Sequence, residues 1–226
     1  MISPQAIPQP GVSPPPKPSP IKGEGRKHPP MADLRPDLAI IADHVPEGAR
    51  VLDIGCGDGG LMAAIRDSKS ADARGLELDA TNVAQAMAKG LSVVQGDADT
   101  DLADYPDSAF DYAILSQTLQ TTRAPDAILT ELLRIAPRAF VSFPNFAYWR
   151  VRANLMFGGR MPVTGALPLS WYATENIHHV TIDDFRALVG EQGITVERAW
   201  YLSGNRQRGA GAANLMAEQA VFLLGR

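Results

Sequence analysis

The chain has 226 residues, of which 45% are hydrophobic, and a formal net charge of −4 at pH 7. Its length suits one α/β domain plus a tail, and its single cysteine, Cys56, excludes an intramolecular disulfide and a cysteine-based metal cluster. No apolar run is long enough to cross a membrane, and the N-terminus lacks the apolar core of a secretory signal. We therefore expect a cytoplasmic protein that does not bind membranes.

Residues 1–30 differ in composition from the rest of the chain. They hold ten of the 18 prolines and a net charge of +3, which leaves −7 for residues 31–226. With few large apolar groups they cannot form a packed core, so we predict a disordered tail. A proline-motif ligand for another protein is the alternative interpretation. The acidic remainder argues against nucleic acid as a partner.

Apolar runs and amphipathic stretches alternate along residues 36–224. Predicted helices cover residues 36–44, a segment from about residue 61, residues 81–89, a segment from Pro125 and a segment after Thr181. Predicted strands cover residues 51–54, 73–78, 91–95, 110–116, 139–143, 195–202 and 218–224. This order predicts a single Rossmann-like α/β domain over residues 31–226, with a seven-stranded, mostly parallel sheet that ends in an antiparallel C-terminal hairpin. Residues 143–182 form a long insert in it.

A glycine-rich turn follows the first predicted strand. Gly55, Gly57 and Gly60 fit the dinucleotide pattern G-x-G-x-x-G, whereas Gly55, Gly57 and Gly59 fit G-x-G-x-G. Asp53 favours the second pattern, because a carboxylate beside the first glycine repels a pyrophosphate but suits the ammonium and sulfonium of S-adenosylmethionine. The phrase resembles the first motif of class I methyltransferases. An NAD-dependent dehydrogenase and a turn without any ligand remain alternatives.

Two further carboxylates follow the second and third predicted strands, where ligands bind in open α/β sheets. Glu77, with Leu78 after it, could accept both ribose hydroxyl protons of an adenosine. Asp97 could accept from the adenine amino group while the backbone of Ala98 donates to the ring. The structural alternatives are a carboxylate at a helix start for Glu77 and a simple turn residue for Asp97.

The segment after the fourth predicted strand, residues 116–120, should lie under the sulfonium. It lacks the histidine or aromatic residue that many methyltransferases have there, although methyl transfer can proceed by positioning alone. We thus expect S-adenosylmethionine or S-adenosylhomocysteine to contact Asp53, Gly55, Cys56, Gly57, Gly59, Glu77, Leu78, Asp97, Ala98, Ser116 and Gln117.

The insert at residues 143–182 holds seven of the 15 aromatic residues and three arginines. Long loops in compact domains are usually functional, and aromatic and arginine side chains are enriched at protein interfaces. The candidates for contact with a partner or substrate are Trp149, Arg150, Arg152, Arg160, Trp171 and Tyr172. Alternatively, Trp149, Ala153 and Phe157 recur at helical spacing and could cover the sheet.

Several phrases in and around this insert resemble the MetW family of methionine biosynthesis proteins. They are Ser142-Phe143-Pro144-Asn145-Phe146, Trp149-Arg150-x-Arg152, Gly159-Arg160-Met161-Pro162-Val163-Thr164, Asn176-Ile177-His178 and Thr181-Ile182-x-Asp184-Phe185. The resemblance spans residues 34–226. It implies the methyltransferase fold and a role in methionine biosynthesis with homoserine O-acyltransferase as partner, but it implies no methyl acceptor.

Two functions follow from these observations. The first is a partner protein that binds S-adenosylmethionine and activates the acyltransferase. The second is a free-standing methyltransferase of a small molecule, whose acceptor pocket would be lined by Asn145, Tyr172 and His178, with His178 as base. A lone histidine is more often structural, and His178 and His179 would point to opposite faces of a strand, so we expect no metal site.

Overall fold

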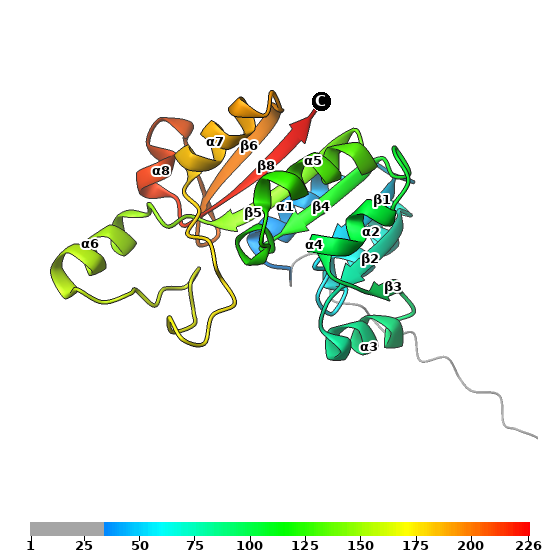
Figure 1. Ribbon diagram of the computed structural model, residues 1–226, viewed down its shortest axis with the longest axis horizontal. Helices are drawn as coiled ribbons and strands as arrows, with labels where there is room; N and C mark the ends of the chain where they lie inside the picture. The colour runs from blue at the N-terminus through cyan, green and yellow to red at the C-terminus, as the bar shows by residue number, and fades with distance from the viewer. Residues whose placement is uncertain (1–33) are drawn as a thin grey trace, which may run out of the picture.

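The computed structural model describes residues 34–226 (Figure 1). The predicted tail, residues 1–30, lies outside this range. One sheet runs through the domain in the order β3-β2-β1-β4-β5-β8-β6-β7. The first five of these strands are parallel, and the last three continue the sheet antiparallel. The bounds are β1 (Arg50–Ile54), β2 (Asp72–Glu77), β3 (Ser92–Gln95), β4 (Tyr112–Ser116), β5 (Arg138–Pro144), β6 (Thr195–Ser203), β7 (Arg206–Arg208) and β8 (Gln219–Gly225).

The predicted fold is confirmed, but the sheet has eight strands and not seven. The additional strand is β7, which lies between the predicted strands at residues 195–202 and 218–224. It pairs with the end of β6 across the two-residue turn Gly204-Asn205, in which Gly204 has a φ of +54°. The glycine permits the tight turn, and the short strand then covers the outer edge of β6.

Helices lie on both faces of the sheet (Figure 1). Their bounds are α1 (Pro36–His44), α2 (Gly60–Lys69), α3 (Ala80–Ala88), α4 (Ala98–Asp101), α5 (Pro125–Ile135), α6 (Trp149–Gly158), α7 (Ile182–Glu191) and α8 (Ala213–Met216), with 3-10 turns η2 (Leu102–Asp104), η3 (Leu119–Thr121) and η4 (Ala210–Ala212). Thr181 caps α7, because its hydroxyl accepts from the Asp184 amide at 3.1 Å.

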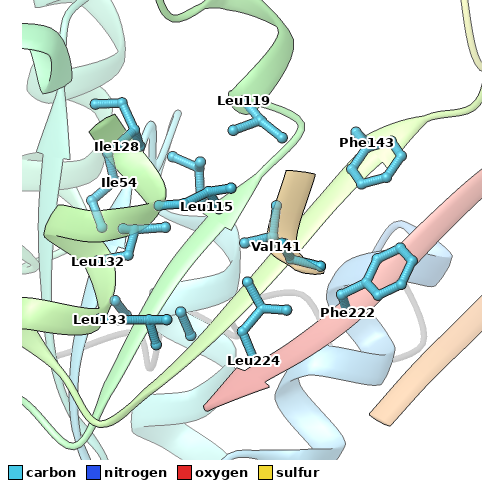
Figure 2. Close-up of a cluster of buried hydrophobic side chains, with 14 of the residues drawn as sticks. Ile54, Leu115, Leu119, Ile128, Leu132, Leu133, Val141, Phe143, Phe222 and Leu224 are labelled. Atoms are coloured by element: carbon cyan, nitrogen blue, oxygen red, sulfur yellow. The ribbon is translucent and has the colours of Figure 1, made fainter. Parts of the chain in front are cut away.

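Alternate residues of each strand face opposite layers of the core, as the pleat requires. On β4, Ala113 and Leu115 pack toward α5 and α7, whereas Tyr112 and Ile114 pack toward α1 and α2. Figure 2 shows the first layer, in which the strand residues meet Ile128 and Leu132 of α5. Because both of its faces are covered, β4 is buried along its whole length.

The insert between β5 and α7 stands apart from these layers. Helix α6 projects beyond the edge of the sheet, and residues 159–180 return from it without a regular helix or strand (Figure 1). Within α6 only Val151 is buried. Trp149 is 42% exposed and Phe157 84% exposed, so the alternative in which this helical stripe covers the sheet is wrong.

Candidate functional site

The turn after β1 follows the G-x-G-x-G pattern. Gly55, Gly57 and Gly59 all have positive φ angles, whereas Gly60 does not and begins α2. A Cβ atom on Gly55 would collide with the side chain of Thr118, so only glycine fits at this position. Cys56 packs against Met62, and burial raises the pKa of its thiol well above the usual range, which leaves it unreactive.

Glu77 ends β2 and faces this turn. Its Oε2 accepts a hydrogen bond from the Gly57 amide at 2.7 Å, and its Oε1 accepts from the Asp79 amide at 2.9 Å. The side chain is buried, yet each carboxylate oxygen can accept a second hydrogen bond. Glu77 therefore fixes the glycine turn and keeps two acceptor positions for hydroxyl groups.

Asp97 follows β3 and begins α4. Its Oδ1 accepts from the Asp99 amide at 3.0 Å, and its own amide donates to Asp101 at 2.9 Å. No described residue donates to the other carboxylate oxygen of Asp97. Asp97 therefore caps α4, whereas the structural alternative was a simple turn residue, and it also lines the hollow described next.

The ends of these strands surround a cavity of about 490 Å³, which we call the nucleotide hollow. Its predicted wall residues are Gly55, Gly57, Glu77, Leu78, Asp97, Ala98, Ser116 and Gln117. It is also lined by Asn82, Asp99, Thr122 and Arg123, which were not predicted from the sequence. Gly59 lies outside, because it caps α2 and faces Leu91 and Ala86.

Asp53 borders a smaller adjoining cavity of about 330 Å³, which Gly55, Cys56 and Ser116 also line. The carboxylate is only 2% exposed and receives no hydrogen bond from any described residue. Burial raises the pKa of Asp53 to about 7, an effect that nearby Arg35 opposes and Glu77 reinforces. A buried carboxylate without a donor suits a ligand that brings a positive charge.

A hydrogen-bond network that was not predicted from the sequence lies beside this cavity. Asp37 of α1 is fully buried, and its carboxylate accepts from Ser116 at 3.0 Å, from Ser142 at 2.9 Å and from the Arg35 guanidinium at 3.2 and 3.3 Å. Arg35 also donates to Ser116 at 3.0 Å. Strands β4 and β5 place the two serines opposite each other, so Asp37 joins α1 to the ends of both strands.

The structure does not bring the three acceptor-pocket candidates together. Asn145 is buried, and its amide binds the backbone of Ala217 at 2.8 Å and of Asn214 at 2.9 Å. Tyr172 is 77% exposed. The backbone of His178 donates to the Gln120 carbonyl at 3.0 Å. None of the three candidates lines the larger cavity beside the nucleotide hollow, whose walls include His179 instead.

The predicted contact residues of the insert all lie at the surface. The exposed residues are Trp149, Arg150, Arg152, Arg160, Trp171 and Tyr172. The Arg150 guanidinium lies 5.3 Å from the ring centre of Trp149, and the rings of Trp171 and Tyr172 meet edge to face at 5.7 Å. Arg152 is different, because it donates to the Ala147 carbonyl at 2.6 Å and so holds the start of α6.

Two absences hold for residues 34–226. No group of three or more metal-ligating side chains comes together there, and none of the helices is long and apolar enough to span a membrane.

The chain was compared with known proteins. A family model described as methionine biosynthesis protein MetW matches residues 35–224. The bifunctional methionine biosynthesis protein MetXA/MetW of Rhodopirellula baltica is 34% identical over 205 residues, which are 85% of this chain and 33% of that protein. The chain thus spans about a third of the length of the curated relative that it matches.

Solved structures share the fold at low sequence identity. An S-adenosylmethionine-dependent methyltransferase from Mesorhizobium loti has a TM-score of 0.64 at 17% identity, with 87% of this chain and all of that chain covered. One from Archaeoglobus fulgidus has a TM-score of 0.60 at 13% identity, with 83% and 89% covered. The chain therefore has the class I methyltransferase fold and belongs to the MetW family of methionine biosynthesis proteins.

Proposed function

We propose that this protein binds S-adenosylmethionine or S-adenosylhomocysteine and acts as a regulatory partner of a homoserine O-acyltransferase. The observation that carries the first part is the convergence of Asp53, Glu77 and Asp97 on adjoining cavities at the carboxyl ends of β1, β2 and β3. The adenosine would lie between Glu77 and Asp97. The ligand's ammonium would lie beside Asp53, and its carboxylate near the first amides of α2.

The residues present fit this ligand in two respects. Asp53 is a buried carboxylate without a donor from the described residues, and an ammonium would supply both the charge and the hydrogen bond that it lacks. Glu77 keeps free acceptor positions for the two ribose hydroxyls. A phosphate on that ribose would meet the same negative charge, which disfavours a phosphorylated dinucleotide.

The second part of the proposal, the partner, rests on the insert. Of the sixteen exposed large hydrophobic residues in the described chain, ten lie between residues 149 and 177. Concentration of apolar side chains on one projecting segment is typical of a protein-binding surface. The relative from Rhodopirellula baltica is named as one bifunctional MetXA/MetW protein, and we infer that its MetXA part corresponds to the acyltransferase that docks on α6 here.

Coupling between the two parts requires the partner to bind the ligand-loaded and ligand-free forms with different affinity. The test is co-purification of this protein with the acyltransferase, followed by activity assays of the mixture with and without S-adenosylmethionine. We expect a stable complex whose acyltransferase activity differs from that of the enzyme alone and responds to the ligand. Unchanged activity in every mixture would refute the regulatory role.

The docking surface can be tested in the same mixtures. Phe157→Ser removes an exposed ring of α6, so it should leave the fold intact and weaken the complex at least tenfold, as loss of an interface anchor does. Met87→Ser is the matched control, because Met87 is also exposed but lies on α3. Equal effects of the two variants would exclude α6 as the docking surface.

A methyltransferase of a small molecule is the second candidate function. It is favoured by a larger cavity that shares Arg35, Gln117 and Thr121 with the nucleotide hollow, where a methyl acceptor could approach the sulfonium. Transfer of a labelled methyl group into a metabolite pool, absent with Glu77→Ala, would support it.

A further inference from the structure

The larger cavity has a volume of about 610 Å³ and shares Arg35, Gln117, Thr121 and Glu175 with the nucleotide hollow, but Asp53, Glu77 and Asp97 do not line it. It lies between the ends of β4 and β5 and the returning part of the insert, residues 161–179. The part of the wall formed by residues 161–171 is apolar and includes Met161, Leu167 and Trp171. A cavity of this size accommodates a small organic molecule whose apolar part faces the insert.

Two oppositely charged groups stand where this cavity meets the nucleotide hollow. Arg35 and Glu175 line both cavities. The Nε and Nη2 atoms of Arg35 are held by Asp37 and Ser116, so the guanidinium has a fixed orientation, whereas its Nη1 donates to no described residue. Glu175 likewise has no hydrogen bond or ion pair with any described residue. One fixed cation and one anion are therefore available to a ligand.

Gln120 provides a third unsatisfied group on the same cavity. Its side chain is buried and its Nε2 donates to the Gln117 carbonyl at 2.7 Å, which fixes the orientation of the amide because a carbonyl oxygen cannot donate. Its Oε1 is buried and has no hydrogen-bond partner. A buried acceptor left unpaired costs about 1–3 kcal/mol. An N–H donor from a ligand would therefore be stabilising once the Gln120 side chain turns to accept its hydrogen bond.

These groups match one class of ligand. We propose that this cavity binds an α-amino acid with an apolar side chain. Its carboxylate pairs with Arg35, and its ammonium donates hydrogen bonds to the Glu175 carboxylate and the Gln120 side-chain oxygen. Arginine suits a carboxylate because its planar group can donate two parallel hydrogen bonds. The apolar walls then hold the side chain. The site does not include Asp53, Glu77 or Asp97, although the two cavities adjoin at Arg35, Gln117, Thr121 and Glu175.

The ligand class is tested by calorimetric titration of the full-length protein. The probes are L-norleucine, L-leucine, L-methionine and L-phenylalanine, with hexanoate and pentylamine as analogues of norleucine that lack the ammonium or the carboxylate. We expect at least one amino acid to bind, and both analogues of norleucine to bind at least tenfold more weakly than norleucine. Absence of binding by all four amino acids at about 5 mM, where even weak millimolar affinity would be detected, would overturn the proposal.

Each titration is repeated with saturating S-adenosylhomocysteine, because that ligand also carries an amino-acid end. Unchanged amino-acid binding would support a separate site. Competition would overturn the proposal, since the amino acid would then occupy the methionyl part of the nucleotide site. If S-adenosylhomocysteine itself does not bind, the proposed function fails, whereas the titrations without it still test the amino-acid site.

Glu175→Gln is the decisive variant, because the exposed side chain has no partner in the described chain and its change should not affect folding. It should weaken amino-acid binding at least tenfold. Glu191→Gln, an exposed carboxylate at the end of α7, is the matched control and should bind as the wild type does. Equal amino-acid affinity in the two variants would show that Glu175 does not bind the ammonium and would overturn the proposal.

Discussion

The Glu77 carboxylate and the Gly57 amide lie 2.7 Å apart, although 20 residues and the whole of α2 separate them in the chain. This contact joins the turn after β1 to the end of β2. The Glu77 side chain thus fixes the relative positions of two segments that line the nucleotide hollow. An ionised acceptor for a backbone amide makes a stronger hydrogen bond than a neutral one. Glu77 thus has both a structural and a binding contribution that substitution can separate.

We expect Glu77→Gln to weaken S-adenosylhomocysteine binding at least tenfold and Glu77→Ala at least 100-fold. The glutamine retains one acceptor oxygen, whereas the alanine retains none, and a hydrogen bond to a charged group contributes about 1.5–3 kcal/mol. Isothermal titration calorimetry measures the affinities, with Glu191→Gln as a control that should match the wild type. Wild-type affinity in Glu77→Gln would show that the ribose does not contact this carboxylate.

Asp53 makes ligand binding and stability depend on pH in opposite directions. Because burial raises the pKa of Asp53 to about 7, the contribution of Asp53 to the stability of the ligand-free protein is greatest below about pH 4, where Asp53 is protonated in both the folded and unfolded states. That contribution is lost as the pH rises from about 4 through 7. A tenfold change in proton affinity is worth about 1.4 kcal/mol, so the total loss is on the order of 4 kcal/mol.

Asp53→Asn should therefore be more stable than the wild type at pH 8, with the difference shrinking toward pH 4. Urea unfolding at several pH values measures this. S-Adenosylhomocysteine should bind the wild type more tightly as the pH rises from 5.5 to 7.5, because its ammonium pairs with the ionised carboxylate, and this rise should be absent in Asp53→Asn. A pH-independent affinity in the wild type would contradict the placement of the ammonium beside Asp53.

The sequence was sufficient for the parts of the fold and site that depend on local patterns. The predicted helix over residues 36–44 has the same bounds in the structure, because Pro36 begins it and Pro46 stops it. Asp53 follows from its place before the glycine turn, and Glu77 and Asp97 follow from the rule that ligands bind at the carboxyl ends of parallel strands. The pair Gly204-Asn205 is typical of a β-hairpin turn, so β7 could also have been predicted from the sequence.

Other features depend on contacts that no local pattern encodes. Asp37 looks like an ordinary acidic residue in a first helical turn, yet it is buried because Ser116 and Ser142 meet it from strands 79 and 105 residues away. Likewise, α6 has the spacing of a sheet-covering helix but is exposed. Only the path of the insert, which leaves the edge of the sheet, decides which way that helix faces.

Gly57→Ala should separate ligand binding from folding. Gly57 has a φ of +55° and open space where a Cβ would lie, so alanine costs about 1–2 kcal/mol of unfolding free energy through backbone strain. Its methyl group also enters the wall of the nucleotide hollow, so affinity for S-adenosylhomocysteine should fall at least tenfold. Gly90→Ala has the same kind of strain, with a φ of +74° and open space, but lies outside the hollow and should bind normally. Similar affinities in the two variants would refute the placement of the ligand against Gly57.

Asp37→Asn should destabilise the protein by about 2–4 kcal/mol. The carboxylate accepts from two buried hydroxyls and from Arg35, and an amide can neither accept from all of them nor balance the guanidinium charge, so at least one buried donor loses its partner. This range is about 1 kcal/mol lower than the 3–5 kcal/mol typical of a fully buried ion pair, because the side chain of Arg35 is 54% exposed and water can solvate it. Asp43→Asn, an exposed carboxylate on the same helix, should change stability by less than about 0.5 kcal/mol.

Urea unfolding of the two variants measures this difference, with an unchanged dependence on denaturant as the sign that the folded state is otherwise intact. Because Asp37 fixes the orientation of Arg35, Asp37→Asn should also weaken amino-acid binding in the larger cavity. Ser142→Ala removes one donor to Asp37 without touching Arg35, so it should cost about 1 kcal/mol and leave that binding unchanged. If Ser142→Ala were as damaging as Asp37→Asn, the stabilisation would come from packing between α1 and β5 and not from the charge of Asp37.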